Sequence, residues 1–120
     1  MVIGIDIDET ITRNPNFFSV LSEALIAAGQ DVIIITFRED IQSTEKALKD
    51  WGIGYTKLVT STLEQHLEFG VNEWKNRVCQ EHSVDVFIED SPEVLKHMDP
   101  SILSLMVVDP SRYDLTKLIE

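Results

Sequence analysis

The sequence predicts an α/β domain, a doubly wound parallel sheet of about five strands that alternate with helices. Short, continuous apolar runs recur along the chain, and such runs are typical of strands that are buried on both faces. Stretches with helical periodicity separate these runs, which is the pattern of βαβ units. In this architecture the carboxyl ends of all the strands share one edge of the sheet, and ligands bind there.

The first strand covers residues 1–5 and contains only apolar residues and Gly4. It leads directly into Asp6, Asp8 and Thr10. Residues two apart on an extended strand point the same way, although a turn that starts between them would splay them. Either way, we expect the two carboxylates to lie together at the ligand-binding edge. Because like charges repel, the pair predicts a metal site or an acid/base pair; an Asp that only caps the next helix is the alternative.

Two strand–helix units follow. Asn14 and Pro15 open a helix that Gly29 ends, and a second apolar strand spans residues 31–35. A second helix spans residues 40–51 and precedes a weaker strand at residues 55–59. The residues that we expect to face the core from the two helices are Phe17, Val20, Leu21, Ala24, Leu25 and Ala28 in the first and Ile41, Ala47, Leu48 and Trp51 in the second.

The second half of the chain has weaker signals at first. Residues 60–71 have no firm periodicity, and we expect at most a short helix there with Leu63 and Leu67 facing inward. Asn72 is a good cap for a clear third helix that carries Lys75 in its first turn. The remaining expected elements are a strand at 85–88, a short helix after Ser91-Pro92, a strand at 103–108 and a terminal helical segment with Leu115, Leu118 and Ile119.

Length and composition indicate a single domain, residues 1–120, with a formal net charge of −11 and a pI near 4.5. This charge should repel nucleic acid and anionic membranes. No apolar run is long enough to span a bilayer, and no signal peptide is visible. The lone Cys79 suits a reducing compartment and is more typical of a core position than of a nucleophile. We therefore expect a cytoplasmic protein with no membrane partner.

The predicted sheet edge gathers side chains with complementary chemistry. Several carboxylates together are oxygen ligands that suit Mg²⁺, a cation that often binds substrate phosphate. Hydroxyl and ammonium groups beside them would donate to a phosphoryl group, an Asp can act as a nucleophile, and a second carboxyl can act as general acid and base. Lys57 is a rival to Lys75 as the site lysine. The gathered residues are Asp6, Asp8, Thr10, Thr36, Arg38, Glu89 and Asp90, with Lys75 within possible reach.

Four short segments resemble the motifs of the haloacid dehalogenase superfamily of phosphatases. Residues 6–10, Asp-Ile-Asp-Glu-Thr, resemble the Asp-x-Asp-x-Thr first motif, and residues 33–36, Ile-Ile-Ile-Thr, resemble the second. Lys75 is placed like the lysine of the third motif, and residues 87–90, Phe-Ile-Glu-Asp, resemble the acidic fourth. All four occur in the right order on the expected elements. The resemblance implies a Rossmann-like fold and a Mg²⁺-dependent hydrolase of phosphate monoesters.

The resemblance also implies catalytic roles. Asp6 would be the nucleophile that forms an aspartyl-phosphate, and Asp8 would be the general acid and then the general base. Thr36 would donate to a phosphoryl oxygen, and Lys75 would neutralise charge on the nucleophile and the phosphate. The presence of Asp8 favours phosphate-ester hydrolysis over the dehalogenase and phosphonatase branches, which lack that acid.

Metal and substrate contacts follow from the same resemblance. Asp90 would bind Mg²⁺ together with Asp6 and the backbone carbonyl of Asp8, and Glu89 would bind the metal or support a ligand. We expect Thr10, Phe37 and Arg38 to contact a small phosphorylated substrate, preferably a sugar phosphate or a nucleotide.

The spacing between the motifs leaves no room for a cap domain. Only a turn and one helix lie between the first two motifs, and only a helix, a strand and residues 60–71 precede the third. Such a capless site suggests a large substrate or a cap from a neighbouring subunit, so a homodimer is possible. Residues 60–71, which include His66, are a candidate flap.

Two other classes of protein fit part of the pattern. A phospho-receiver signalling domain has a similar length and an acidic pair after its first strand, but it needs an acceptor Asp at the end of its third strand. Here that strand ends around residues 56–60 without an acid. A superfamily member that has lost activity and serves as a binding module is the other alternative.

Overall fold

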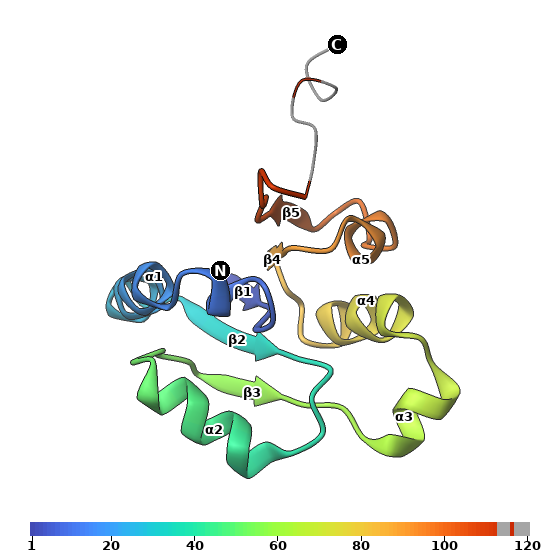
Figure 1. Cartoon of the computed structure of the whole chain (residues 1–120), viewed down its shortest axis with the longest axis horizontal. Helices are drawn as coiled ribbons and strands as arrows, with labels where there is room; N and C mark the ends of the chain where they lie inside the picture. The colour runs from blue at the N-terminus through green and yellow to red at the C-terminus, as the bar shows by residue number, and fades with distance from the viewer. Residues whose placement is uncertain (113–115, 117–120) are drawn as a thin grey trace.

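A computed structural model describes residues 1–112 and 116 of the chain. Its centre is one sheet of five parallel strands in the order β3-β2-β1-β4-β5, which confirms the predicted doubly wound α/β fold (Figure 1). The order changes direction between β1 and β4, because the chain moves outward from β1 first on one side and then on the other. The strands are β1 (Val2–Ile5), β2 (Asp31–Ile35), β3 (Lys57–Val59), β4 (Val86–Glu89) and β5 (Leu103–Met106).

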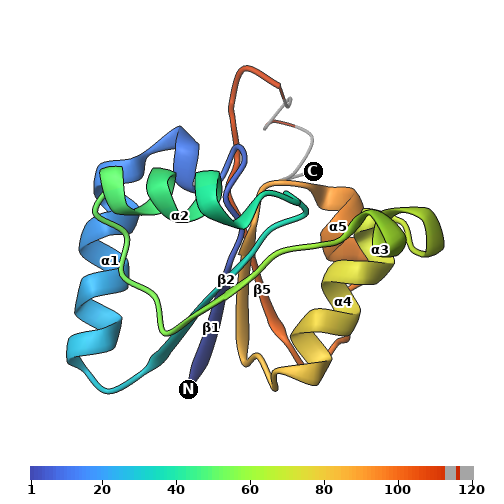
Figure 2. The same ribbon diagram turned by 90° about the horizontal axis from the view of Figure 1, so that it is seen from below.

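Helices cover both faces of the sheet. Figure 2 shows α1 and α2 on one side and α3, α4 and α5 on the other. Among the described residues, no helix has the length and apolar character that would be needed to cross a membrane. The helices are η1 (Ile11–Arg13, a single 3-10 turn), α1 (Pro15–Ala27), α2 (Ile41–Asp50), α3 (Leu63–Glu68), α4 (Val71–Glu81) and α5 (Pro92–Lys96).

Alternate residues of the central strands fill two apolar cores. Ile3 and Ile5 of β1 pack with Phe18 of α1 on one face of the sheet. On the other face, Ile35 of β2 and Trp74 of α4 pack in the second core. Complete burial of one such side chain contributes about 1.5–3 kcal/mol relative to exposure. Both cores therefore hold the carboxyl ends of β1 and β4 in fixed positions.

Gly4 allows the second core to close over β1. A Cβ atom on this residue would lie 3.0 Å from Cδ1 of Phe87 and 3.1 Å from Cδ1 of Ile35. The side chains of the two neighbouring strands thus occupy the space above Gly4. This close packing beside the last residues of β1 leaves no room for a larger side chain.

Most of the predicted helix starts are correct. The side chains of Asn14, Asp40 and Ser91 each accept a hydrogen bond from a backbone N–H in the first turn of the helix that follows. The start of α4 differs from the prediction, because Gly70 occupies the N-cap position and Asn72 lies inside the helix. Lys75 therefore lies in the second turn of α4 rather than in the first.

Several apolar residues that were expected to face the core are exposed. α1 buries Phe18 and Ser22 and α2 buries Thr44 and Leu48, so each helix is rotated relative to its predicted apolar stripe. α3 buries no residue. The predicted terminal residues Leu115, Leu118 and Ile119 lie outside the described residues. The residues whose predicted burial is wrong are Phe17, Val20, Ala24, Ala28, Ile41, Leu63 and Leu67.

Candidate active site

The turn after β1 separates the two aspartates of the first motif. The Asp6 N–H donates to the carbonyl of Ile88 at 3.0 Å and keeps Asp6 beside β4. The chain then reverses, since the N–H groups of Thr10 and Thr12 both donate to the Ile7 carbonyl, and Glu9 adopts a φ of 61°. Because the turn starts between the two acids, Asp6 is buried and Asp8 is exposed. Both acids nevertheless line one pocket at the carboxyl edge, as expected, but they lie in different environments.

Asp6 belongs to a buried group of four polar side chains. Its Oδ1 lies 2.6 Å from Nζ of Lys75, and its Oδ2 accepts a hydrogen bond of 3.0 Å from the Thr10 hydroxyl. The Lys75 Nζ also lies 2.8 Å from Oε2 of Glu89. We call Asp6, Thr10, Lys75 and Glu89 the inner cluster. Each of its members is at most 4% exposed, so contacts within the protein, and not solvent, fix the geometry of Asp6.

Lys75, and not its rival Lys57, is the lysine of this site. α4 carries the Lys75 ammonium to the carboxyl edge, where it contacts acids from β1 and β4. Lys57 is exposed at the first residue of β3, which is the opposite end of its strand.

The inner cluster carries more negative than positive charge when both of its acids are ionised. Burial raises the pKa of Asp6 and that of Glu89, although the Lys75 ammonium lowers both pKa values, and the nearby Asp90 raises them further. Burial alone would lower the pKa of Lys75, but the charges of Asp6 and Glu89 outweigh it and raise that pKa. Lys75 thus stays charged. A further cation would reduce the repulsion among the neighbouring carboxylates of Asp6, Glu89 and Asp90.

Three carboxylates are close enough to hold a metal ion. Asp6, Glu89 and Asp90 each offer an oxygen atom, and these atoms all lie within 4.8 Å of one another. A set of oxygen donors alone suits a hard divalent cation such as Mg²⁺. Asp8 does not contribute its carboxylate to this group, and the predicted contact through its backbone carbonyl stays a prediction. The group lies where the strand order changes direction, which is the usual ligand site of open α/β sheets.

A pocket of about 300 Å³ opens above these carboxylates. Val71, at the first residue of α4, is its single contribution from the candidate flap at residues 60–71. The predicted substrate contact Phe37 lines the pocket, whereas the predicted contact Thr10 instead supports Asp6 from below. The lining residues are Asp6, Asp8, Glu9, Phe37, Val71, Lys75, Glu89, Asp90, Ser91 and Val94.

Arg38 forms an ion pair with Asp8, which lines this pocket, whereas Arg38 itself is not among the lining residues. The Arg38 Nε donates to Asp8 Oδ2 at 3.1 Å and its Nη2 donates to Oδ1 at 2.7 Å, so the pair has the two-bond geometry of a strong Arg–carboxylate contact. We call Asp8 and Arg38 the outer pair. The Thr36 hydroxyl is completely buried and accepts a hydrogen bond of 3.3 Å from the Arg38 N–H. Thr36 does not line the pocket, and its contact with a phosphoryl group stays a prediction.

The stack of Phe37 on His66 was not predicted from the sequence. The two rings are 3.7 Å apart and nearly parallel, and His66 also contacts the Ser61 hydroxyl and the Phe37 carbonyl. The Ser61 hydroxyl also donates to the Phe37 carbonyl at 2.6 Å, so Phe37 contacts residues 24 and 29 positions further along the chain. These contacts fix the segment from Phe37 to Arg38 against α3.

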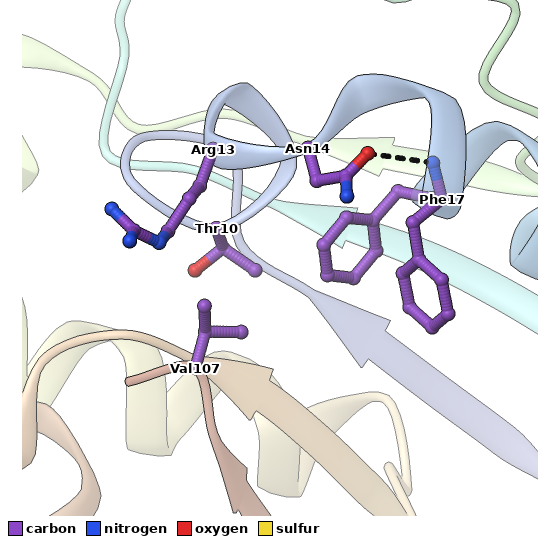
Figure 3. Close-up of a pocket in the computed structure, with 6 residues that line it drawn as sticks. Thr10, Arg13, Asn14, Phe17 and Val107 are labelled. Atoms are coloured by element: carbon purple, nitrogen blue, oxygen red, sulfur yellow. Dashed lines mark hydrogen bonds between the residues drawn. The ribbon is translucent and has the colours of Figure 1, made fainter. Parts of the chain in front are cut away.

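A second pocket, of about 550 Å³, lies on the other side of the β1 turn. Figure 3 shows it between Thr10, Arg13, Phe17 and Val107, with the Asn14 cap bonded to the Phe17 N–H. Arg13 forms an ion pair of 2.9 Å with Asp109. No carboxylate is among the described residues that line this pocket, so it does not provide the groups of the predicted reaction.

Comparisons with known proteins support the fold. No family model matches the chain, and no curated protein matches its sequence. Two solved structures are similar, one described as "Structure of Pnkp1/Rnl/Hen1 complex" and the other as "Structure of the Pnkp1/Rnl/Hen1 RNA repair complex". Both have a TM-score of 0.71 and 18% sequence identity over 88% of this chain. The chain spans 45% and 42% of the lengths of these two chains, so the likeness concerns the fold of less than half of each.

Proposed function

We propose that this protein is a Mg²⁺-dependent phosphatase of the haloacid dehalogenase type, with Asp6 as its nucleophile. The observation that carries the proposal is the inner cluster, in which a buried carboxylate is held between an ammonium and a hydroxyl. Two more carboxylates lie within 4.8 Å of it, and the exposed acid Asp8 lines the same pocket. A nucleophile, a cation site and a proton donor thus meet in one pocket.

The reaction would proceed in two steps. In the first, a carboxylate oxygen of Asp6 attacks the phosphorus atom, the bond to the ester oxygen breaks, and Asp8 gives its proton to the leaving oxygen. In the second, Asp8 accepts a proton from water, and the water oxygen displaces Asp6 from phosphorus to release inorganic phosphate. Lys75 and Thr10 keep Asp6 oriented through both steps. A Mg²⁺ ion held by Asp6, Glu89 and Asp90 would supply positive charge for the phosphoryl oxygens.

The exposure of Asp8 fits the role of an acid and base. A group that serves the leaving oxygen and then water must reach both, and the Asp8 side chain is 61% exposed on the pocket wall. Burial and hydrogen bonds hold Asp6 in place at the same time. The splaying of the two acids therefore gives them different environments and supports different roles.

A small phosphorylated metabolite, such as a sugar phosphate or a nucleotide, is the proposed substrate class. The similar chains belong to an RNA repair complex, but this chain has a net charge of −11. Acids are also half of the residues that line its pocket. Because nucleic-acid binding relies on basic surfaces that neutralise several phosphates, these charges favour a small substrate over a nucleic-acid end.

Hydrolysis of p-nitrophenyl phosphate tests the proposal. We expect turnover with Mg²⁺, its loss with EDTA, and a loss of at least about a thousandfold in Asp6→Asn. Asp109→Asn is the matched control, because Asp109 lies at the same sheet edge but is paired with Arg13 outside the pocket. Undiminished turnover in Asp6→Asn would contradict the assignment of the nucleophile. Mg²⁺ binding without any turnover would instead favour the binding-module alternative.

A further inference from the structure

We propose that Arg38 binds a second anionic group of the substrate. The preferred substrate would then be a phosphate monoester whose leaving group carries another phosphate or a carboxylate close to the ester oxygen. This inference rests on the proposed function and narrows its substrate class.

The first argument is the number of donors that Arg38 has left. A guanidinium group carries five N–H donors, and Asp8 uses one on Nε and one on Nη2. The other three, including both on Nη1, have no partner among the residues that the structure describes. The Arg38 side chain is 33% exposed, so these donors are accessible to a ligand. Arg38 can therefore hold Asp8 and a second anion at the same time.

The second argument is the charge around the pocket. Its lining contains the carboxylates of Asp6, Asp8, Glu9, Glu89 and Asp90, but only one cationic side chain, that of Lys75. The Lys75 ammonium already contacts two of these carboxylates and is 4% exposed. A second anion on the substrate would be repelled by the rest of the lining. Arg38 does not line the pocket, but it is bonded to Asp8, which does, so the outer pair places a further cation beside the lining.

The third argument is the position of Arg38 relative to the reacting atoms. A general acid must lie within hydrogen-bond reach of the leaving oxygen, at about 2.6–3.2 Å. Arg38 is bonded to both oxygen atoms of Asp8, so a leaving oxygen that accepts the proton of Asp8 would lie near the guanidinium group. A second anion that reaches the free donors of that group must therefore be a few bonds from the ester.

The backbone around Arg38 is prepared for such a contact. Its N–H donates to the Thr36 hydroxyl at 3.3 Å, and its carbonyl accepts from the Ser61 N–H at 3.1 Å. Both partners are buried. Because the backbone is fixed on both sides, less conformational entropy is lost when the guanidinium binds an anion.

Binding in a protein that cannot turn over gives the direct test. In an Asp6→Asn background with excess Mg²⁺, isothermal titration calorimetry compares ethylene glycol bisphosphate with ethyl phosphate. We expect the bisphosphate to bind roughly ten- to a hundredfold more tightly, as charge-assisted hydrogen bonds predict. In Arg38→Gln the ratio of the two affinities should fall close to one. In Arg38→Lys it should recover only in part, because an ammonium lacks the planar fork of a guanidinium.

Lys46→Gln is the matched control. It removes one exposed cation and its ion pair with Asp50 on α2, so it changes the net charge by the same amount away from the pocket. The proposal requires that the ratio is kept in Lys46→Gln and falls in Arg38→Gln. An equal ratio in all these proteins would overturn it. Failure of the proposed function would be a separate result. It would appear as a lack of p-nitrophenyl phosphate turnover in the protein with Asp6 intact, which does not depend on the affinity ratio.

Discussion

The inner cluster and the outer pair place the same kinds of charge at the same sheet edge in opposite environments. The Lys75 side chain is 5% exposed and contacts two buried carboxylates, whereas Arg38 and Asp8 are 33% and 61% exposed. Charges that are removed from water must be paired, and their positions are then fixed by the fold. Charges that stay in water are screened and can exchange partners. Under the proposed function, the inner cluster would provide structural support and nucleophilic attack, and the outer pair would provide proton transfer and substrate contact.

Removal of the buried cation should have the largest effect. Lys75→Met leaves Asp6 and Glu89 buried without their partner, so we expect a loss of about 3–5 kcal/mol in the free energy of unfolding without metal. Urea denaturation in EDTA measures this loss. Lys46→Met is the control, because Lys46 lies on the surface in an exposed ion pair. A similar effect in both variants would show that the inner cluster does not depend on its ammonium.

Removal of the exposed acid should affect the reaction rather than the fold. We expect Asp8→Asn to lower kcat/KM for an alkyl phosphate by about 10²- to 10⁴-fold, the usual contribution of a general acid or base. The loss should be smaller for p-nitrophenyl phosphate, because its leaving group needs little protonation. The thermal unfolding of Asp8→Asn should stay close to that of the unmodified protein, since the lost ion pair is solvent-exposed.

Glu9→Gln is the matched control for Asp8, because Glu9 also lines the pocket and is exposed. The role of Asp8 would be refuted by equal losses for alkyl and aryl phosphates, or by a comparable loss in Glu9→Gln.

Glu89→Gln should stabilise the protein without metal while it weakens Mg²⁺ binding. Burial raises the pKa of the Glu89 carboxyl in the folded state, so the stability that it contributes is present at low pH and is lost as the pH rises toward its folded pKa. We therefore expect the variant to gain about 1 kcal/mol at pH near 7.5 in EDTA. The gain should shrink near pH 5.5.

Chemical denaturation of both proteins at the two pH values measures the difference, and Mg²⁺ titration measures the weakened site. The inner cluster would not hold excess negative charge if Glu89→Gln destabilised the metal-free protein more at pH near 7.5 than near 5.5.

The smallest predicted effect is a difference in salt dependence between the outer pair and the inner cluster. Raising the ionic strength from about 0.05 M to about 0.5 M shortens the screening length, so the affinity of the bisphosphate probe should fall by roughly two- to fivefold more with Arg38 than with Arg38→Gln. The buried contacts of Lys75 are shielded from ions, and the stability difference between Lys75→Met and the unmodified protein should change little. Calorimetry and urea denaturation at both salt concentrations test this contrast.

Local patterns in the sequence were sufficient to predict the sheet and some of the helix caps. The apolar runs that became β1, β2 and β4 are buried on both faces, and only a parallel sheet covered by helices provides that environment. The predicted caps at Asn14 and Ser91 each act on an N–H group three residues away, so their function is also local. The predicted cap at Asn72 is wrong, because Gly70 takes that position. Since the strand ends were predicted, the gathering of Asp6, Glu89 and Asp90 at one edge followed from the fold class.

Several features depend on packing between distant segments. Phe17 is exposed because α1 buries the face that carries Phe18 and Ser22, and Leu67 is exposed because α3 buries no residue. Periodicity fixes which residues share a face but not which face is covered. The choice of Lys75 over Lys57 required the path of α4, which brings together residues 69 positions apart. The stack of Phe37 on His66 likewise has no local signal.

By itself, the sequence determined which chemical groups reach the carboxyl edge, because strand length and turn position are set by neighbouring residues. Only the tertiary structure decided how those groups are shared between buried and exposed positions. The turn that starts after Asp6 directs Asp6 toward β4 and Asp8 toward Arg38. Burial then sets the charge balance of each group, and it depends on every element packed around the site rather than on the residues beside it in the chain.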